Sequence, residues 1–374
     1  GSVAGLSVGT PDRPGEEPSF RIRGTNSIGP RGNNEEKQAF NLKNQPLIVV
    51  DGVIFKGSLN DINSADVASV DILKDASSAA VYGSRSANGV IIVTTKKGTS
   101  DKPLFNFSTS YGVSDPVSLI PVLDGDQYVQ KILDVRVAQG VEANPNNIND
   151  YLTITESNNL NAGRTVDWYD KLVQTATTQT YSGSVSGRTE KSNYFVSGSY
   201  NTQEGIVEND NFDRLSMRVN LSQNITDWFK LSVNSSYSYL DYSGVAVPLS
   251  YGLSPYSNFY ETGSNQETLE FFPMEDPFFR HPFLEKQIDD QDTRSNLWGL
   301  VSAEIKIPFV KGLKWTINYS ASNNVTKKFE FRDNTLAIPQ NGEAKKRITE
   351  NYNWLFDNIL NYNRVFSDVH SVSG

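Results

Sequence analysis

The sequence of 374 residues contains no cysteine and only two histidines, His281 and His370. The absence of cysteine excludes a disulfide framework, thiolate metal sites and a cysteine nucleophile. Two histidines leave little room for a histidine-based metal site. No set of nucleophile, base and acid recurs at a persuasive spacing, so the sequence predicts no catalytic site, no enzyme activity, no metal and no cofactor.

The sequence also lacks a basic excess and long apolar runs. Its formal net charge of −9 argues against a nucleic-acid partner, which would need a basic patch. No apolar segment approaches the roughly 18 residues of a membrane-spanning helix. That absence excludes only helical membrane proteins, because a membrane-spanning β-strand needs about 10 residues of alternating polarity.

Charge and pattern divide the chain near residue 99. The head, residues 1–99, contains 11 basic and 10 acidic residues, whereas the remaining residues contain 23 basic and 33 acidic ones. A near-neutral head and an acidic body indicate two regions. We therefore expect one domain over 1–99 and another over 100–374.

The head contains short apolar runs that predict a small mixed α/β unit. Residues 46–50 predict a buried strand that ends in a tight turn at Asp51-Gly52. We prefer this turn, with glycine at positive φ, over a ligand loop at the end of a parallel strand. The other expected elements are a helical turn leading into a strand over 64–73, a short helix over 76–82 that ends at Gly83, and a strand over 90–95.

Apolar and polar side chains alternate from about residue 104 onward. Phe105 and Phe107, for example, alternate with Asn106 and Ser108. Successive side chains of a strand point to opposite faces, so this period predicts strands with one apolar face and one face of Ser, Asn, Arg and Lys. Phe195 breaks the polar side of its segment. We expect about eight strands, within residues 105–111, 179–187, 193–201, 214–222, 229–239, 297–307, 313–321 and 352–362.

The connections distinguish a soluble β-sandwich from a membrane β-barrel. Every second connection is a tight turn, and an up-and-down barrel with short periplasmic turns and long outer loops has this parity. A Greek-key sandwich has no reason to show it, so the sequence favours a mainly β, transmembrane antiparallel barrel. Aromatic residues near strand ends add modest support. The longer connections are 113–178, 204–210, 243–293 and 333–343, and the short ones are 189–191, 225–227, 308–311 and 365–368.

The head carries motifs that are specific to one family. Residues 20–27 read FRIRGTNS, residues 46–53 read PLIVVDGV, and residues 71–98 read DILKDASSAAVYGSRSANGVIIVTTKKG. This run closely resembles the plug domain of TonB-dependent outer-membrane transporters of the SusC/RagA family. Ser64 and Ser86 are mild departures from the family pattern. The plug-motif residues are Arg21, Arg23, Gly24, Asp51, Gly52, Lys74, Asp75, Tyr82, Gly83, Arg85, Asn88 and Gly89.

The body resembles the start of that family's barrel, in the motifs TVDW at 165–168 and QEGIV at 203–207. A plugged barrel of this kind has about 22 strands. The resemblance therefore implies a partial barrel and a chain that is part of a longer protein. The signal peptide, any amino-terminal extension, the TonB box and the first part of the plug would lie upstream of Gly1. It also implies that Arg85 pairs with carboxylates of the barrel wall.

The resemblance implies import across the outer membrane of a Gram-negative, Bacteroidetes-like cell. The nutrient would be too large for porins, usually an oligosaccharide and sometimes a peptide. A SusD/RagB-like surface lipoprotein would cover the outer loops, and the TonB–ExbB–ExbD complex would supply the energy. Two alternatives stay open, a receptor that binds and signals without import and a soluble β-rich carbohydrate-binding protein.

The two long loops are rich in aromatic side chains. Such rings can stack on sugars or pack on a partner protein, or they can form the loop's own small core. A helix is expected at 126–138. The acidic runs 208–211 and 289–292 could bind calcium, although solvated acidic loops are the preferred interpretation. The candidate substrate or lipoprotein contacts are Trp168, Tyr169, Tyr251, Tyr256, Phe259 and Tyr260.

Overall fold

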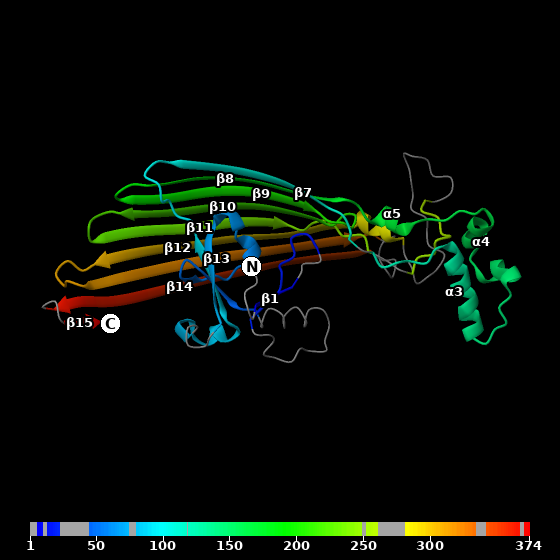
Figure 1. Cartoon of the computed structure of the whole chain (residues 1–374), viewed down its shortest axis with the longest axis horizontal. Helices are drawn as coiled ribbons and strands as arrows, with labels where there is room; N and C mark the ends of the chain where they lie inside the picture. Colours follow the sequence, from blue (N-terminus) through cyan, green and yellow to red (C-terminus); the bar gives the residue numbers. More distant parts are fainter. Residues whose placement is uncertain are drawn as a thin grey trace.

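A computed structural model describes residues 6–9, 13–22, 45–74, 80–117, 119–248, 252–260, 281–333, 342–366 and 370–374. A long antiparallel sheet forms a wall, and a small four-stranded sheet lies against one of its faces (Figure 1). A helical region projects beyond one end of the wall, on the right of the view. We call the part before residue 100 the plug and the long sheet the wall.

The wall contains nine strands, each hydrogen-bonded to its neighbours in the sequence. All pairs are antiparallel, which confirms the predicted up-and-down order. The sheet stays open, as expected for a partial barrel. The strands are β7 (Leu104–Ser114), β8 (Ala176–Arg188), β9 (Ser192–Glu204), β10 (Asn211–Asn224), β11 (Phe229–Asp241), β12 (Asp289–Lys306), β13 (Leu313–Arg332), β14 (Glu343–Phe366) and β15 (His370–Ser373).

The last long strands exceed the alternating segments that predicted them. β12, β13 and β14 have 18, 20 and 24 residues, and the extensions of β12 and β14 toward the longer connections are mainly polar. A bilayer is crossed by about 9–11 tilted strand residues. Beyond that depth both faces of a strand are wet, so hydrogen bonding to the neighbouring strand continues after the apolar alternation has ended.

The predicted parity of the connections is confirmed. Residues 189–191, 225–228 and 307–312 connect strands at one end of the wall, whereas 115–175 and 242–288 connect strands at the other. Figure 1 shows the short turns on the left and the helices of the long loops on the right. The two ends of the wall are therefore unlike each other.

The plug sheet has the strand order β4-β3-β6-β5. β3 and β6 are parallel and the other two pairs are antiparallel, so the plug sheet is of mixed direction. A separate two-stranded pair joins β1 (Leu6–Val8) and β2 (Phe20–Ile22). The sheet strands are β3 (Leu47–Val50), β4 (Val53–Ile54), β5 (Val67–Leu73) and β6 (Val90–Thr95).

Short 3-10 helices lead into and out of the plug strands. η1 (Leu59–Asp61) begins with a capping box of Ser58 and Asp61. The Asp61 carboxylate accepts from the Ser58 amide, and the Ser58 hydroxyl accepts from the Asn60 amide. η2 (Ser64–Asp66) runs directly into β5, as predicted for 64–73. A short helix is expected at 76–82, but residues 76–79 lie outside the described residues. The described part continues as η3 (Ala80–Asn88), in which Gly83 has φ +70°.

The long loops contain three α-helices and two 3-10 helices among the described residues. α3 (Gly125–Ala138) confirms the helix expected at 126–138 and begins at a capping box of Asp124 and Gln127. Within the described residues, no helix is both long and apolar enough to cross a membrane. The other elements of this region are η4 (Pro145–Tyr151), α4 (Ile154–Asn161), α5 (Trp168–Leu172) and η5 (Pro282–Gln287).

The main apolar core is shared between the plug and the wall. Trp298 and Leu300 of β12 are buried against plug residues that include Phe55, Ile62 and Val93. The Trp298 and Phe55 rings meet edge to face with centroids 6.0 Å apart. The opposite face of the wall is exposed and apolar, for example at Phe105, which suits a lipid-facing surface.

Candidate functional site at the contact of plug and wall

Asp51 forms the first anchor between plug and wall. It sits at φ +49° in the β3–β4 turn, followed by Gly52 at φ +88°, so the predicted tight turn is confirmed. Its carboxylate accepts hydrogen bonds from the Thr95 amide at 2.9 Å and the Thr95 hydroxyl at 2.6 Å. Arg218 of β10 donates through Nη2 to Asp51 Oδ2 at 3.1 Å, and Asn234 of β11 donates to the same oxygen.

The wall supplies Arg218 because its position in β10 faces the plug. Its Nη2 also donates to the Thr95 hydroxyl at 3.1 Å and to Asn234 Oδ1 at 2.8 Å. The side chains of Arg218 and Asp51 are only 3% and 9% exposed. Buried charges cost several kcal/mol to desolvate, and the bonds of Arg218 Nη2 to Asp51, Thr95 and Asn234 offset part of that cost, although Arg218 Nε has no hydrogen-bond partner among the described residues.

Asp61, at the end of η1, forms the second anchor. Its Oδ2 accepts from the Ser58 amide at 2.7 Å, from Arg294 Nη2 of β12 at 2.8 Å and from Asn296 Nδ2 at 3.0 Å. Its Oδ1 accepts from the Ser238 hydroxyl of β11 at 3.0 Å. One buried carboxylate thus caps its own helix and binds two wall strands.

The anchors place carboxylates on the plug and arginines on the wall. The expected pairing had the opposite sense, with Arg85 of the plug against wall carboxylates. The Arg85 side chain lies outside the described residues, so that pairing stays a prediction. Arg218 was visible in the sequence as a charged residue on the polar face of its alternating segment, but the periodicity carried no information about its partner.

Weaker contacts join other parts of the plug to the wall. Arg13 forms an ion pair with Asp210 in the β9–β10 loop at 2.7 Å. Asn193 at the start of β9 accepts from the Gly98 amide at 3.1 Å. Near the other end of the wall, Tyr242 donates its hydroxyl to the Gly15 carbonyl at 3.2 Å. The plug is therefore held at both ends of the wall and at mid-height.

Apart from Asp51, the described residues of the predicted plug motif are placed as follows. Tyr82 packs beside the buried Val49 and Val90. Gly89 has φ +87°, and a Cβ there would lie 2.6 Å from Ile22 Cδ1. Arg21 lies in β2, Lys74 follows β5, Asn88 ends η3, and Arg23, Gly24 and Asp75 lie outside the described residues.

The predicted aromatic contacts divide by burial. Trp168 and Tyr256 are each 5% exposed, and Trp168 donates its indole N–H to the Ser254 carbonyl at 3.0 Å. Phe259 packs on the same loop core, Tyr169 is half-buried, and Tyr260 is 42% exposed. Tyr251 lies outside the described residues. Contact of these rings with a substrate or lipoprotein stays a prediction.

His281 belongs to the same loop core. Its ring centroid lies 5.3 Å from that of Trp168 and 5.0 Å from that of Phe259. Its Nδ1 accepts a hydrogen bond from the Phe283 amide at 3.3 Å. Burial lowers the pKa of His281 to about 4, so the ring is neutral near pH 7.

The acidic runs that suggested calcium are occupied by protein partners. Glu208 pairs with Lys286 at 2.5 Å, and Asp292 pairs with Lys328 at 2.7 Å. Asp290 accepts from the Gly244 amide at 2.9 Å. The interpretation of 289–292 as a loop was wrong, because these residues begin β12. Across the part of the chain that the structure describes, no three His, Asp or Glu side chains gather as a metal site.

Comparison with known proteins now places the chain. Residues 1–90 match the family described as the TonB-dependent receptor plug domain. SusC, a TonB-dependent receptor of Bacteroides thetaiotaomicron, is 32% identical over 288 residues, which are 72% of this chain and 25% of SusC. The chain is part of a SusC-like TonB-dependent receptor. Such receptors are β-barrel proteins of the Gram-negative outer membrane, which excludes the soluble carbohydrate-binding alternative.

Other relatives agree with this placement. The TonB-dependent receptor P3 of Formosa agariphila is 28% identical over 394 residues, covering all of this chain and 35% of P3. The chain spans about a third of the length of the first three curated relatives. The RagAB peptide importer in its closed-closed state shares the fold, with a TM-score of 0.79 and 24% identity over 100% of this chain and 44% of that chain.

Proposed function

We propose that the complete protein imports a nutrient, most simply an oligosaccharide, across the outer membrane by a TonB-dependent mechanism. The observation that carries the proposal is a plug held against the lumenal face of a barrel wall by Asp51 and Asp61. A passage closed in this way needs an energy-driven displacement of the plug. The outer membrane has no ATP, so the TonB–ExbB–ExbD complex would supply that energy.

A SusD/RagB-like surface lipoprotein would cover the outer loops. The projection formed by residues 115–175 exposes apolar side chains, including Ile154 at 78% and Val137 at 63%. Exposed apolar surface rimmed by polar residues is typical of protein interfaces. The predicted contacts Tyr169, Phe259 and Tyr260 lie in the same outer region and would meet either the lipoprotein or the substrate.

The substrate class rests on the family resemblance, which implies an oligosaccharide usually and a peptide sometimes. Two structures of the RagAB peptide importer share the fold at 24% and 25% identity, which keeps a peptide as a candidate. An oligosaccharide is therefore our first candidate and a peptide the second. Signalling without import remains the alternative, in which the plug changes conformation when a ligand binds but no solute passes.

Uptake by living cells tests the proposal. The full-length gene is deleted, and uptake of fluorescent oligosaccharides and peptides is measured in the deletion strain, the parent and a TonB-deficient strain. We expect one class of ligand to lose uptake in both mutant strains and to regain it on complementation. Unchanged uptake across the panel would contradict import, and loss of a transcriptional response alone would favour signalling.

A further inference from the structure

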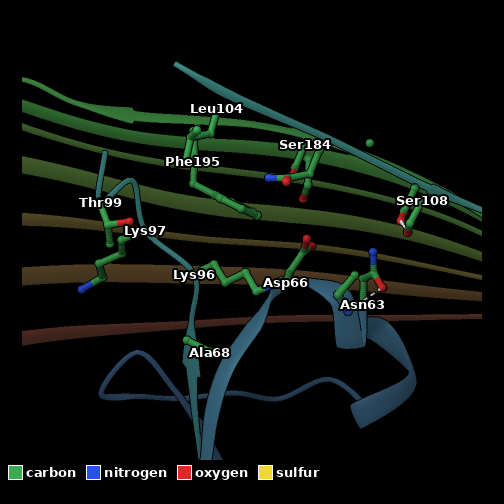
Figure 2. A pocket seen from close by; sticks show the side chains of 16 residues that line it. Asn63, Asp66, Ala68, Lys96, Lys97, Thr99, Leu104, Ser108, Ser184 and Phe195 are labelled. Carbon is green, nitrogen blue, oxygen red and sulfur yellow. Dashed lines mark hydrogen bonds between the residues drawn. The ribbon is translucent and has the colours of Figure 1, made fainter. Parts of the chain in front are cut away.

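The plug meets the two halves of the described wall very differently. Against β10–β12 it is anchored through Asp51 and Asp61 and through the shared core at Trp298. Against β7–β9 a cavity of about 530 Å³ separates plug from wall. Figure 2 shows Asp66 and Lys96 of the plug facing this cavity from below, with the wall strands above it.

The wall side of the cavity is uncharged and lined mainly by serines, with Leu104 and Phe195 as its apolar side chains. The described plug residues form no hydrogen bond with Asn106, Ser182 or Ser184, and Ser182 bonds instead to the neighbouring Ser108 at 2.7 Å. Among the described residues, no buried ion pair joins the plug to this side at mid-height, and the hydrogen bonds from the plug to β9 lie near the ends of that strand, at Asn193 and Gln203.

One buried hydroxyl at the cavity has an unmet bonding capacity. Ser197 of β9 is 8% exposed, and its Oγ has no hydrogen-bond partner of acceptable geometry although it approaches Asp66. Asp66 is itself 5% exposed, and burial raises the pKa of its carboxyl. A buried polar group without a well-formed hydrogen bond costs about 1–3 kcal/mol, so this contact between β9 and Asp66 of the plug holds the closed state only weakly.

The same lining continues along the middle of β8. From Thr178 to Ser186 its plug-facing positions, identified by the pairing of Ser182 with Ser108 and of Ser184 with Asn106, carry only hydroxyls, and Ala176 and Arg188 end the row. Serine and threonine hydroxyls can donate and accept hydrogen bonds with a sugar, and they carry no charge that would bind a ligand tightly at one position. A neutral ligand can therefore move from one hydroxyl to the next. These positions are Thr178, Thr180, Ser182, Ser184 and Ser186.

We propose that the passage opens on the β7–β9 side, where a neutral, hydroxyl-rich solute moves along the serine and threonine face of β8. The plug meanwhile stays attached to β10–β12 through Asp51 and Asp61. The inference rests on the proposed import function and adds to it the side of the barrel and the residues that the solute meets.

Single cysteines in an otherwise cysteine-free full-length protein test this inference. Ser184→Cys places a thiol in the cavity, and Ser236→Cys places a matched thiol on β11, where Ser236 pairs in register with Arg218 and Trp298. Both serines are half-buried. Intact cells with and without TonB are treated with a membrane-impermeant fluorescent maleimide, and the labelling rate of each cysteine is measured.

We expect TonB to raise the labelling rate at Ser184→Cys by about tenfold or more, as a shift from a rarely open to a frequently open state implies, and to leave Ser236→Cys nearly unchanged. Faster labelling only at Ser236→Cys, or equally at both, would overturn the inference while leaving TonB-dependent opening intact. No effect of TonB at either position would contradict the proposed function itself.

Discussion

Arg218 Nη2 of the wall lies 3.1 Å from Asp51 Oδ2 of the plug, and both side chains are almost fully buried. Replacing Arg218 by methionine leaves the Asp51 carboxylate buried without its cation. Breaking such a pair costs about 3–5 kcal/mol, which corresponds to a rise of roughly a hundredfold or more in the opening equilibrium. Hydrogen exchange of residues 47–50 in the purified full-length protein would measure this loss of protection.

Two further variants make that prediction specific. The double variant Arg218→Met with Asp51→Asn removes both charges, so we expect it to recover part of the lost protection. Arg188→Met breaks an ion pair with Asp101 whose side chains are 54% and 82% exposed, and should change protection little. Equal effects of Arg188→Met and Arg218→Met would contradict the role of the buried pair.

Trp298 joins the wall to the apolar face of the plug. The side chain is 2% exposed and meets Phe55 edge to face, so Trp298→Ala should weaken this contact by about 3–5 kcal/mol. We expect the plug to become sensitive to limited proteolysis. Trp354 on β14 is 65% exposed on the outer face, and Trp354→Ala should leave the plug resistant. A protease-resistant plug in Trp298→Ala would show that the core contact is dispensable.

The turn that presents Asp51 depends on Gly52. Its φ of +88° strains any residue with a Cβ, although no atom lies within 4 Å of where that Cβ would be. Gly52→Ala should therefore destabilise the turn through the backbone alone, by roughly 1–2 kcal/mol. Gly52→Asn should cost less, because asparagine tolerates positive φ. The urea concentration at which the plug becomes cleavable would rank the three proteins, and identical midpoints would refute the prediction.

The period-2 pattern predicted the wall because each strand has one face in lipid and one in a wet lumen. The same pattern could not show where the plug docks. That information resides in Trp298 and Leu300, two apolar residues at polar-face positions of β12 that pack on the plug. Neither stood out in the sequence, where the noted exception was Phe195 of β9.

The anchors were harder to predict than the wall. Asp51 drew attention as a turn residue and through the plug motif, and the arginines of β10 as members of a polar face. Asp61 was not singled out, because a carboxylate that ends a short helix has the same sequence signature whether or not an arginine faces it. The pairing of Asp61 with Arg294 depends on how the plug is positioned against the wall. The alternation of residues along one strand carries no information about that position.

His281 gives the outer-loop core a dependence on pH. Its pKa is lowered to about 4 in the folded loop from an ordinary value of 6.5, so the fold favours the neutral ring. The stability that this preference contributes is fully present above about pH 6.5 and is lost as pH falls toward 4.

We expect hydrogen exchange of residues 252–260, corrected for intrinsic rates, to be slow at pH 7 and faster near pH 4.5. His281→Gln should lose this dependence, and His370→Gln, a change at the exposed histidine of β15, should retain it. Protection that is unchanged between the two pH values in the unaltered protein would show that protonation of His281 does not open this core.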